Sequence, residues 1–237
     1  MHLKIRDAAV LLGVSVQTID RWLEEKKIPV HRIDDQDRFE YAELFEFAIR
    51  EQLQPSPRLM QAMQVQDAAT AGGCLKDGGI HYGVGGKTKR EVLENALQMI
   101  QGMEPAATGP LLEMFLAREH LASTGIGDGI AIPHTRTALV GYVAKPLLSL
   151  AFLETPIDYD ALDGKPVQAL FLLVSPTIRS HLLILGRLSF ALRNALFRKA
   201  VLRRDPPEKI IAILRAIESR MPQGTHPAST GLRRRDP

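Results

Sequence analysis

The stretch from residue 123 to 136, Ser-Thr-Gly-Ile-Gly-Asp-Gly-Ile-Ala-Ile-Pro-His-Thr-Arg, constrains this chain more than any other segment. Gly125, Gly127 and Gly129 alternate, and glycine tolerates positive φ and a close approach of neighbouring groups. The apolar run 130–132 suits a strand that enters a core. Pro133 then fixes the backbone directly before His134. This order predicts a mobile glycine loop and a histidine held at the rim of a cleft. The alternative is a tight turn that carries a surface histidine.

Composition limits the class of protein. A chain of 237 residues with 45% hydrophobic residues can form one large domain or two modest ones with a real core. The single cysteine, Cys74, excludes an internal disulfide framework, and its glycine-rich surroundings favour an idle thiol over a nucleophile. The sequence shows neither an apolar run of membrane-spanning length nor a secretory signal, so a cytoplasmic protein with no membrane association is expected.

The first 53 residues read as a small, mainly helical domain. Apolar residues follow helical spacing in 5–12, Gly13 ends that helix, and Ser15 caps a second helix over 16–25. A β-hairpin is predicted over 28–39, followed by a helix over 41–53. Two short helices joined by a glycine turn are a helix-turn-helix signature.

This segment resembles the winged helix-turn-helix domains of the excisionase and MerR-type superfamily. The resemblance lies in Ala8-Ala9 with Leu12-Gly13-Val14-Ser15, in residues 18–23, in Ile28-Pro29, and in Arg32-Ile33 before Arg38-Phe39. It implies DNA as a partner, with the second helix in the major groove and the wing on the backbone or minor groove. The implied DNA contacts are Ser15, Gln17, Thr18 and Arg21 in the groove and Arg32 and Arg38 in the wing.

The charge of this segment supports another interpretation. Residues 1–54 hold eight Lys and Arg against eleven Asp and Glu, a net charge of −3, while the whole chain carries +3 and the remainder therefore +6. Because phosphate contacts supply most DNA affinity, the negative charge fits ordinary solvated residues on a helical adaptor. If the segment does bind DNA, useful affinity from so small a module requires a homodimer.

The rest of the chain predicts an α/β domain. Residues 54–79 read as a flexible linker, 80–220 as the second domain and 221–237 as a disordered tail. Helices are expected from 88 and from 109, strands over 147–153 and 167–174, one long helix from 180 past 196, and a final helix after 205. The expected fold is a mixed sheet flanked by helices and half-covered by them.

Three residues in this domain carry a second resemblance. The pattern GIGxGIAIPH around His134, Arg118 in an Arg-Glu pair before the loop, and His181 at the start of a helix resemble enzyme IIA (EIIA) domains of the phosphotransferase system. The match is to the fructose, mannitol and nitrogen-regulatory type; Thr135-Arg136 departs from many relatives. The resemblance implies that His134 accepts a phosphoryl group from an HPr-type phosphocarrier protein. It also places Arg118 beside that histidine and His181 across the cleft, as supports.

The chemistry of these residues fits that role. Neutral imidazole is a good phosphoryl acceptor near pH 7, and phosphoryl transfer depends mostly on positioning and charge balance. Thr124 and the glycine-loop amides are candidate oxyanion donors. The alternatives are a surface salt bridge between Arg118 and Glu119 or another acid, and a helix-capping role for His181. The other histidines have no metal-ligand spacing, so neither a metal nor a cofactor is expected.

Three functions remain open from the sequence. The first is a phosphorylation-responsive regulator, in which a DNA-binding or adaptor head reads the state of an EIIA-like phosphoacceptor. The second is an EIIA component of a sugar-uptake relay that passes phosphate to a separate enzyme IIB, with the N-terminal segment as a docking module. The third is a binding protein with an inactive EIIA fold, against which the presence of both His134 and His181 argues.

Overall fold

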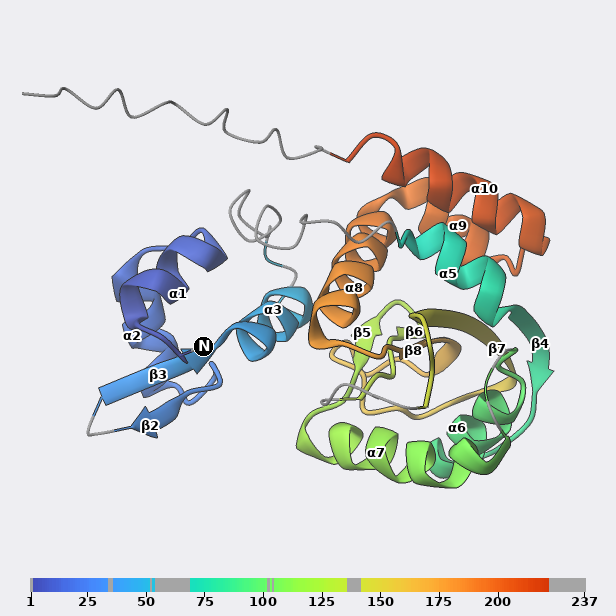
Figure 1. Cartoon of the computed structure of the whole chain (residues 1–237), viewed down its shortest axis with the longest axis horizontal. Coiled ribbons are helices and arrows are strands. Elements are labelled where there is room, and N and C mark those ends of the chain that lie inside the picture. Colours follow the sequence, from blue (N-terminus) through green and yellow to red (C-terminus); the bar gives the residue numbers. More distant parts are fainter. Residues whose placement is uncertain are drawn as a thin grey trace, which may run out of the picture.

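The computed structural model describes residues 2–33, 36–51, 53, 69–101, 103, 105–135 and 142–221 (Figure 1). We call residues 2–53 the head and residues 69–221 the C-terminal domain. Most of the predicted linker, the predicted tail from residue 222 and Arg136 lie outside the described residues. Within the described ranges, no helix is both long enough and apolar enough to cross a membrane.

The head contains the helices and the hairpin that its sequence predicts. After β1 (His2–Leu3) come α1 (Ile5–Leu12), α2 (Val16–Glu24), β2 (His31–Ile33), β3 (Gln36–Glu40) and α3 (Tyr41–Arg50). Gly13 ends α1 with a φ of 68°, and the Ser15 hydroxyl caps α2 by accepting from the Thr18 N–H. The strands form an antiparallel sheet in the order β1-β3-β2. Membership of the winged helix-turn-helix class stays a prediction.

The C-terminal domain is built on a mixed five-stranded sheet in the order β4-β7-β8-β6-β5. Its elements are α5 (Ala71–Gly78), β4 (Ile80–Val84), α6 (Lys89–Gln98), a 3₁₀ turn (Pro105–Ala107), α7 (Thr108–Leu121), β5 (Gly125–Gly127), β6 (Ile130–Ala131), β7 (Leu147–Ile157), β8 (Val167–Val174), α8 (Ile178–Arg193), α9 (Ala195–Leu202) and α10 (Pro207–Glu218). Parallel pairs β4–β7 and β6–β8 alternate with antiparallel pairs β7–β8 and β5–β6. The predicted mixed sheet with flanking helices is confirmed.

Both faces of this sheet are covered, whereas the sequence predicted a half-covered sheet. Along β8, Phe171 and Leu173 pack into one apolar cluster with α5, α8, α9 and α10, while Leu170 and Leu172 pack into another with α6 and α7. Figure 1 shows α8 to α10 on one side and α6 and α7 on the other. The continuous apolar runs of β7 and β8 fit this arrangement, because a strand with two buried faces shows no polar alternation.

The predicted linker over 54–79 differs at its end, where residues 71–78 form α5. Ala71 and Leu75 are fully buried against the sheet, and Cys74 is also buried, so this segment belongs to the C-terminal domain. The Thr70 hydroxyl accepts from the Gly73 N–H. The Glu218 carboxylate accepts from the N–H groups of Ala71 and Gly72. The small residues of this segment suggested a loop. The segment is a helix because one of its faces is buried and the distant Glu218 carboxylate caps its start.

The long helix predicted from residue 180 past 196 is two helices. Asn194 leaves the helical conformation, with φ −75° and ψ 120°, and its side chain accepts from the N–H groups of Leu196 and Phe197 at the start of α9. A single capping asparagine therefore separates α8 from α9 inside an otherwise continuous apolar pattern.

We expect Glu218→Ala to lower the free energy of unfolding of the C-terminal domain by about 2–4 kcal/mol. The carboxylate accepts from Ala71 N–H at 2.7 Å and Gly72 N–H at 2.9 Å, and Arg187 lies 3.4 Å away, so its removal leaves buried donors without an acceptor. Denaturant unfolding measures the change. Glu208→Ala, an exposed acid on the same helix, is the control and should cost less than about 1 kcal/mol. Equal losses for both variants would contradict this account.

One helix of the head packs on the C-terminal domain. Leu44 and Phe47 of α3 belong to the apolar core of the head, but Phe45 is fully buried in the cluster that contains α8 of the C-terminal domain. In Figure 1, α3 lies beside α8. The Arg193 guanidinium of α8 also donates to the carbonyl of Leu53. The helix is thus shared between two cores.

Candidate active site

The glycine loop is a tight hairpin rather than a mobile loop. Gly127 and Gly129 adopt φ values of 95° and 75° around the turn that joins β5 to β6. A Cβ on Gly125 would lie 2.8 Å from the Cβ of Ala161, so only glycine permits this packing. The alternation of glycines that the sequence shows therefore serves one sharp turn and one close approach.

Pro133 and the sheet hold His134 in place. The Pro133 carbonyl accepts from the Leu173 N–H at 3.0 Å, and His134 forms a parallel bridge with the same residue of β8. The His134 Nδ1 lies 2.7 Å from the Ile132 carbonyl, which can only accept, so Nδ1 carries the proton of a neutral ring and Nε2 carries a lone pair. His134 is 5% exposed, which excludes the surface histidine that the sequence left open.

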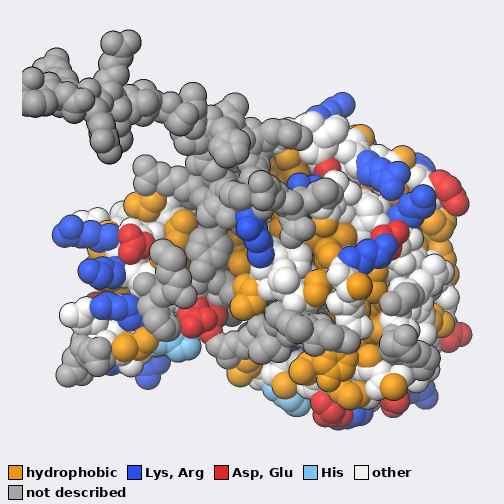
Figure 2. All heavy atoms as spheres, in the orientation of Figure 1, with side chains coloured by type: hydrophobic (Ala, Val, Ile, Leu, Met, Phe, Trp, Pro, Cys, Tyr) orange, Lys and Arg blue, Asp and Glu red, His pale blue; other side chains and the backbone are white. Residues whose placement is uncertain are grey.

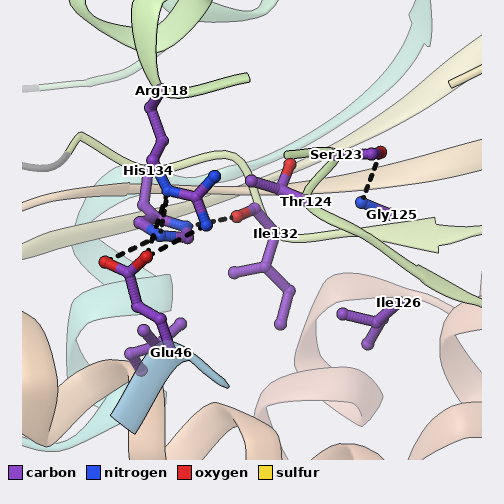
Figure 3. A pocket seen from close by; sticks show the side chains of 9 residues that line it. Glu46, Arg118, Ser123, Thr124, Gly125, Ile126, Ile132 and His134 are labelled. Carbon is purple, nitrogen blue, oxygen red and sulfur yellow. Dashed lines mark hydrogen bonds and ion pairs between the residues drawn. The ribbon is translucent and has the colours of Figure 1, made fainter. Parts of the chain in front are cut away.

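Arg118 lies beside His134, as the resemblance implies. It comes from the last turn of α7, and its Nη1 donates to the Ala122 carbonyl at 2.8 Å. Its Nε lies 3.2 Å from His134 Nε2 (Figure 3). A guanidinium in this position can balance negative charge on a group attached to Nε2.

His181 faces His134 from the first turn of α8. Thr177 caps that helix through the Ser180 N–H, and the two imidazole centroids are 5.2 Å apart at 48°. Burial, together with the neighbouring His134 and Arg118, lowers the pKa of His181 to about 3, against the opposing effect of Glu46. His181 is therefore neutral near pH 7. Its Nε2 is buried and has no hydrogen-bond partner among the described residues, which fits a donor kept for a ligand oxygen.

Thr124 does not direct a donor at His134. Its N–H and its hydroxyl both donate to the Glu119 carboxylate, at 2.8 and 2.6 Å. Glu119 is itself buried, so it stabilises the start of the loop instead of pairing with Arg118 at the surface. The sequence offered a signal for this, since Glu119 stands four residues after buried Phe115 on the inner face of α7. An oxyanion role for Thr124 stays a prediction.

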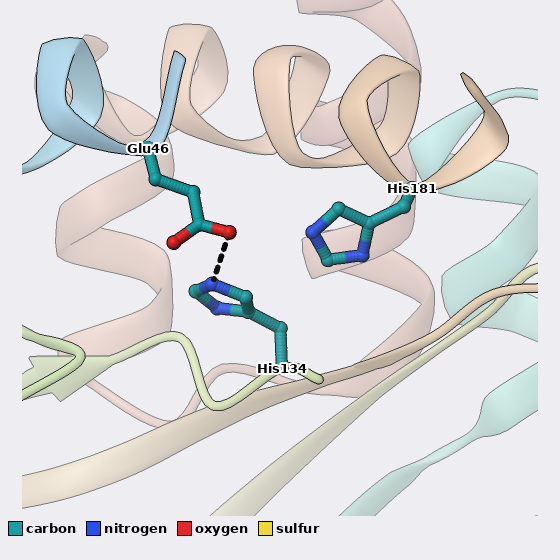
Figure 4. A group of neighbouring side chains, drawn as sticks. All are labelled: Glu46, His134 and His181. Carbon is teal, nitrogen blue, oxygen red and sulfur yellow. Dashed lines mark ion pairs between the residues drawn. The ribbon is translucent and has the colours of Figure 1, made fainter. Parts of the chain in front are cut away.

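Glu46 is the residue that the sequence analysis missed. It projects from α3 of the head, and its Oε2 lies 3.0 Å from Arg118 Nη2 (Figure 3). Its Oε1 lies 3.4 Å from His134 Nε2 (Figure 4). Burial alone would raise the pKa of this carboxyl, but the neighbouring His134, then Arg118 and His181, lower it to about 2. The sequence held one sign of a special role for Glu46: it is a single acid within the otherwise apolar run Leu44-Phe45-Glu46-Phe47-Ala48.

Glu46, His134 and His181 also have the residue types of a metal site, and their ligand atoms lie within 4.8 Å of one another. They come from three distant segments, which is why a search for spacing along the chain did not find them. The Arg118 guanidinium contacts both Glu46 and His134, so a metal cation would have to displace a fixed positive charge. The arrangement suits an anion better than a cation.

The predicted DNA-contact residues lie on α2 and on the β2–β3 hairpin, apart from this site. Gln17, Arg21 and Arg32 are exposed, Ser15 caps α2, and Thr18 is half-buried and hydrogen-bonded to that cap. Arg38 is half-buried and donates to the backbone of Asp37 and the side chain of Gln36. Nothing in these contacts assigns the residues to DNA.

We expect acidification from pH 6.5 to 4.5 to destabilise the protein through His181. Its folded-state pKa of about 3 lies below the ordinary 6.5, so the unfolded chain takes up a proton in this window and the folded chain does not. The stability that a neutral His181 provides above pH 6.5 is then lost as the pH falls, by about 2 kcal/mol across the window. Protonation of Glu46 changes the stability only below pH 4.5, the ordinary pKa of this carboxyl.

Denaturant unfolding of His181→Gln at both pH values measures this contribution, because the variant should show a correspondingly smaller pH dependence. His120→Gln changes an exposed histidine of α7 and should keep the slope of the original protein. An unchanged slope in His181→Gln would contradict a buried neutral imidazole.

Comparison with known proteins assigns this fold to a family. The family described as "Phosphoenolpyruvate-dependent sugar phosphotransferase system, EIIA 2" matches residues 74–217. The chain is 37% identical over 115 residues to a nitrogen regulatory protein of Pseudomonas aeruginosa, across 47% of this chain and 73% of that protein. It is 36% identical over 105 residues to a fructose-specific EIIA component of the phosphotransferase system from Haloferax volcanii, across 44% of this chain and 66% of that protein.

A solved structure agrees with this placement. The nitrogen regulatory protein IIA-Ntr of Neisseria meningitidis matches with a TM-score of 0.51 and 28% identity, over 60% of this chain and 97% of that one. The mixed sheet between two layers of helices is therefore the fold of an EIIA-type protein. The chain belongs to the phosphotransferase-system EIIA type 2 family, through its C-terminal domain.

Proposed function

We propose that this chain is a histidine phosphocarrier that accepts a phosphoryl group on Nε2 of His134. The observation that supports this most directly is the tautomer: the Ile132 carbonyl holds the proton on Nδ1, so Nε2 is free to attack phosphorus. Arg118 lies on the same nitrogen, and neutral His181 stands across from it. Family membership and the nitrogen regulatory relatives point the same way.

The proposed transfer step exchanges one P–N bond for another. A phosphohistidine of an HPr-type donor is the phosphoryl source; its P–N bond breaks as the bond from phosphorus to His134 Nε2 forms. The donor imidazole leaves with the electron pair of the broken bond. Arg118 balances the charge on the phosphoryl oxygens, and an N–H of His181 can donate to one of them.

Incubation of the full chain with phosphoenolpyruvate, enzyme I and an HPr-type phosphocarrier tests the proposal. We expect a gain of one phosphoryl group in the intact mass, which is lost again in acid because a phosphoramidate is acid-labile. No gain from this system, and none from the small donor phosphoramidate, would overturn the proposal.

We further propose that the head binds DNA, as a homodimer, and that phosphorylation of His134 governs this binding. Gln17 and Arg21 are exposed on α2, and Figure 2 shows basic side chains on the outer side of the head. The acids Asp20 and Glu24 are exposed on the same helix, which limits the affinity of one copy. A titration at fixed salt, on DNA selected with the full chain and with phosphorylated and unphosphorylated protein, tests the DNA binding and its dependence on phosphorylation. Absence of any selected DNA would favour an adaptor.

A relay in sugar uptake is the second candidate. It is favoured by the likeness to the fructose-specific EIIA component of Haloferax volcanii and by the head's packing on the phosphoacceptor domain, which fits a docking module. Rapid transfer of the phosphoryl group from His134 to a separate enzyme IIB would distinguish this candidate from a regulator.

A further inference from the structure

The contact between α3 of the head and the site around His134 has a consequence beyond phosphate acceptance. Two neighbouring residues of α3 make it: Phe45, fully buried in the apolar cluster of α8, and Glu46, whose side chain is 16% exposed. The phenylalanine fixes the helix on the domain, and the carboxylate enters the site. Glu43, one turn earlier on α3, hydrogen-bonds His31 of the head at 2.7 Å.

The space beside His134 is narrow while α3 is docked. The cavity between Glu46, Arg118 and His134 has a volume of about 30 Å³, which is room for one or two water molecules. A phosphoryl group still attached to the imidazole of a donor protein does not fit there. His134 itself is 5% exposed. A donor can therefore reach Nε2 only after α3 moves away.

The Glu46 carboxylate also occupies the positions that a phosphoryl group needs. It contacts Arg118 through both Nε, at 3.1 Å, and Nη2, at 3.0 Å, and so uses the guanidinium that would face the phosphoryl oxygens. Its other oxygen lies 3.4 Å from His134 Nε2, in the space that the phosphorus atom of an incoming phosphoryl group needs. Two anions cannot share one arginine in a buried site without strong repulsion.

We infer that Glu46 is a built-in competitor of the phosphoryl group, so that docking of the head through α3 and phosphorylation of His134 exclude each other. This inference rests on the proposed function, in which His134 is the acceptor. Because coupling between two sites is reciprocal, the factor by which docking weakens phosphoryl acceptance is the factor by which phosphorylation weakens docking. The head is then presented differently in the two states.

The first test is the rate at which the full chain takes up phosphate. We expect Glu46→Gln to be phosphorylated at least about 10-fold faster than the original chain, both by the HPr-type donor and by phosphoramidate, because the charge that holds α3 in the site is gone. Glu43→Gln is the matched control: it removes a carboxylate from the same helix without a contact to His134, and it should keep the original rate.

The outcomes separate this inference from the proposed function. Equal rates for the original chain and Glu46→Gln would overturn the competition and leave His134 as acceptor. A slower Glu46→Gln would also overturn it, because Glu46 would then assist the transfer. Absence of phosphate in every variant would overturn the proposed function, and the docking would be judged by the second test alone.

The second test measures docking without any phosphoryl transfer. Amide hydrogen exchange should be faster in α3 of Glu46→Gln than in the original chain, and faster also in His134→Asp, where a second carboxylate competes for Arg118. Exchange in α6, on the far side of the sheet, should not change. Unaltered protection of α3 in both variants would overturn the inference.

Discussion

His134→Ala should abolish phosphate uptake completely, since the variant lacks the nitrogen that forms the bond to phosphorus. Intact mass spectrometry after exposure to the phosphoenolpyruvate-driven donor system should show one phosphoryl group on the original chain and none on the variant. We expect no residual uptake, because Arg118 and Thr124 can support a transfer but cannot become a phosphohistidine. His181 is a histidine, but it does not have the geometry of His134.

Two further variants protect this result against a folding artefact. His134→Asn retains a side-chain N–H that can donate to the Ile132 carbonyl, as Nδ1 does at 2.7 Å, so the hairpin stays supported while the nucleophile is lost. It should also take up no phosphate. His120→Ala removes an exposed histidine of α7 and should be phosphorylated like the original chain. Uptake by His134→Asn would mean that another histidine is the acceptor.

The second large effect is expected at Arg118. Arg118→Ala should slow phosphoryl transfer about 10²–10³-fold, as the loss of one charge-stabilising donor does at comparable oxyanion sites. His134 should still become fully modified when the reaction is given time. Arg118→Lys should recover part of the rate, because it keeps the charge but not the planar fork that faces Nε2. Stopped reactions followed by mass spectrometry give the single-turnover rates.

The same substitution has an opposing effect in the full chain, because Arg118 also holds Glu46 at 3.0 Å. Loss of the guanidinium loosens α3 and opens the site while it slows the chemistry. The comparison is therefore made in a Glu46→Gln background, where the docking charge is already absent and only the chemical effect remains. Arg90→Ala removes an exposed arginine that pairs with Glu113, and serves as the control. Original rates in Arg118→Ala on that background would exclude a role in transfer.

Much of the local structure followed from patterns along the chain. The apolar runs predicted β7 and β8, and a helix was expected from residue 88, where Thr88 caps α6. The glycine-proline order predicted a histidine held directly after Pro133. The boundary between α8 and α9 was missed because a capping asparagine interrupts apolar spacing without changing it. The helix α5 was missed because its stability comes from burial and from Glu218, neither of which shows in a stretch of small residues.

What the sequence by itself determined is the local setting of three residues of the candidate site, each within its own element. His134, His181 and Arg118 stand in patterns whose local geometry is set within a few residues: a turn and a proline, the first turn of a helix, and the last turn of another. Short-range backbone rules are enough to place such groups relative to their own elements.

Only the tertiary structure decided that the Glu46 carboxylate fills the space beside Arg118 and His134. The contact between Arg118 and Glu46 joins residues 72 positions apart, and no periodicity along the chain reports a pairing between two separate cores. The acid lies in an apolar helix whose opposite faces serve the head and the C-terminal domain, so its partner exists only once both are folded and packed. In our proposal, burial of that carboxylate beside an arginine and two imidazoles turns the phosphoacceptor site into one that its own chain closes.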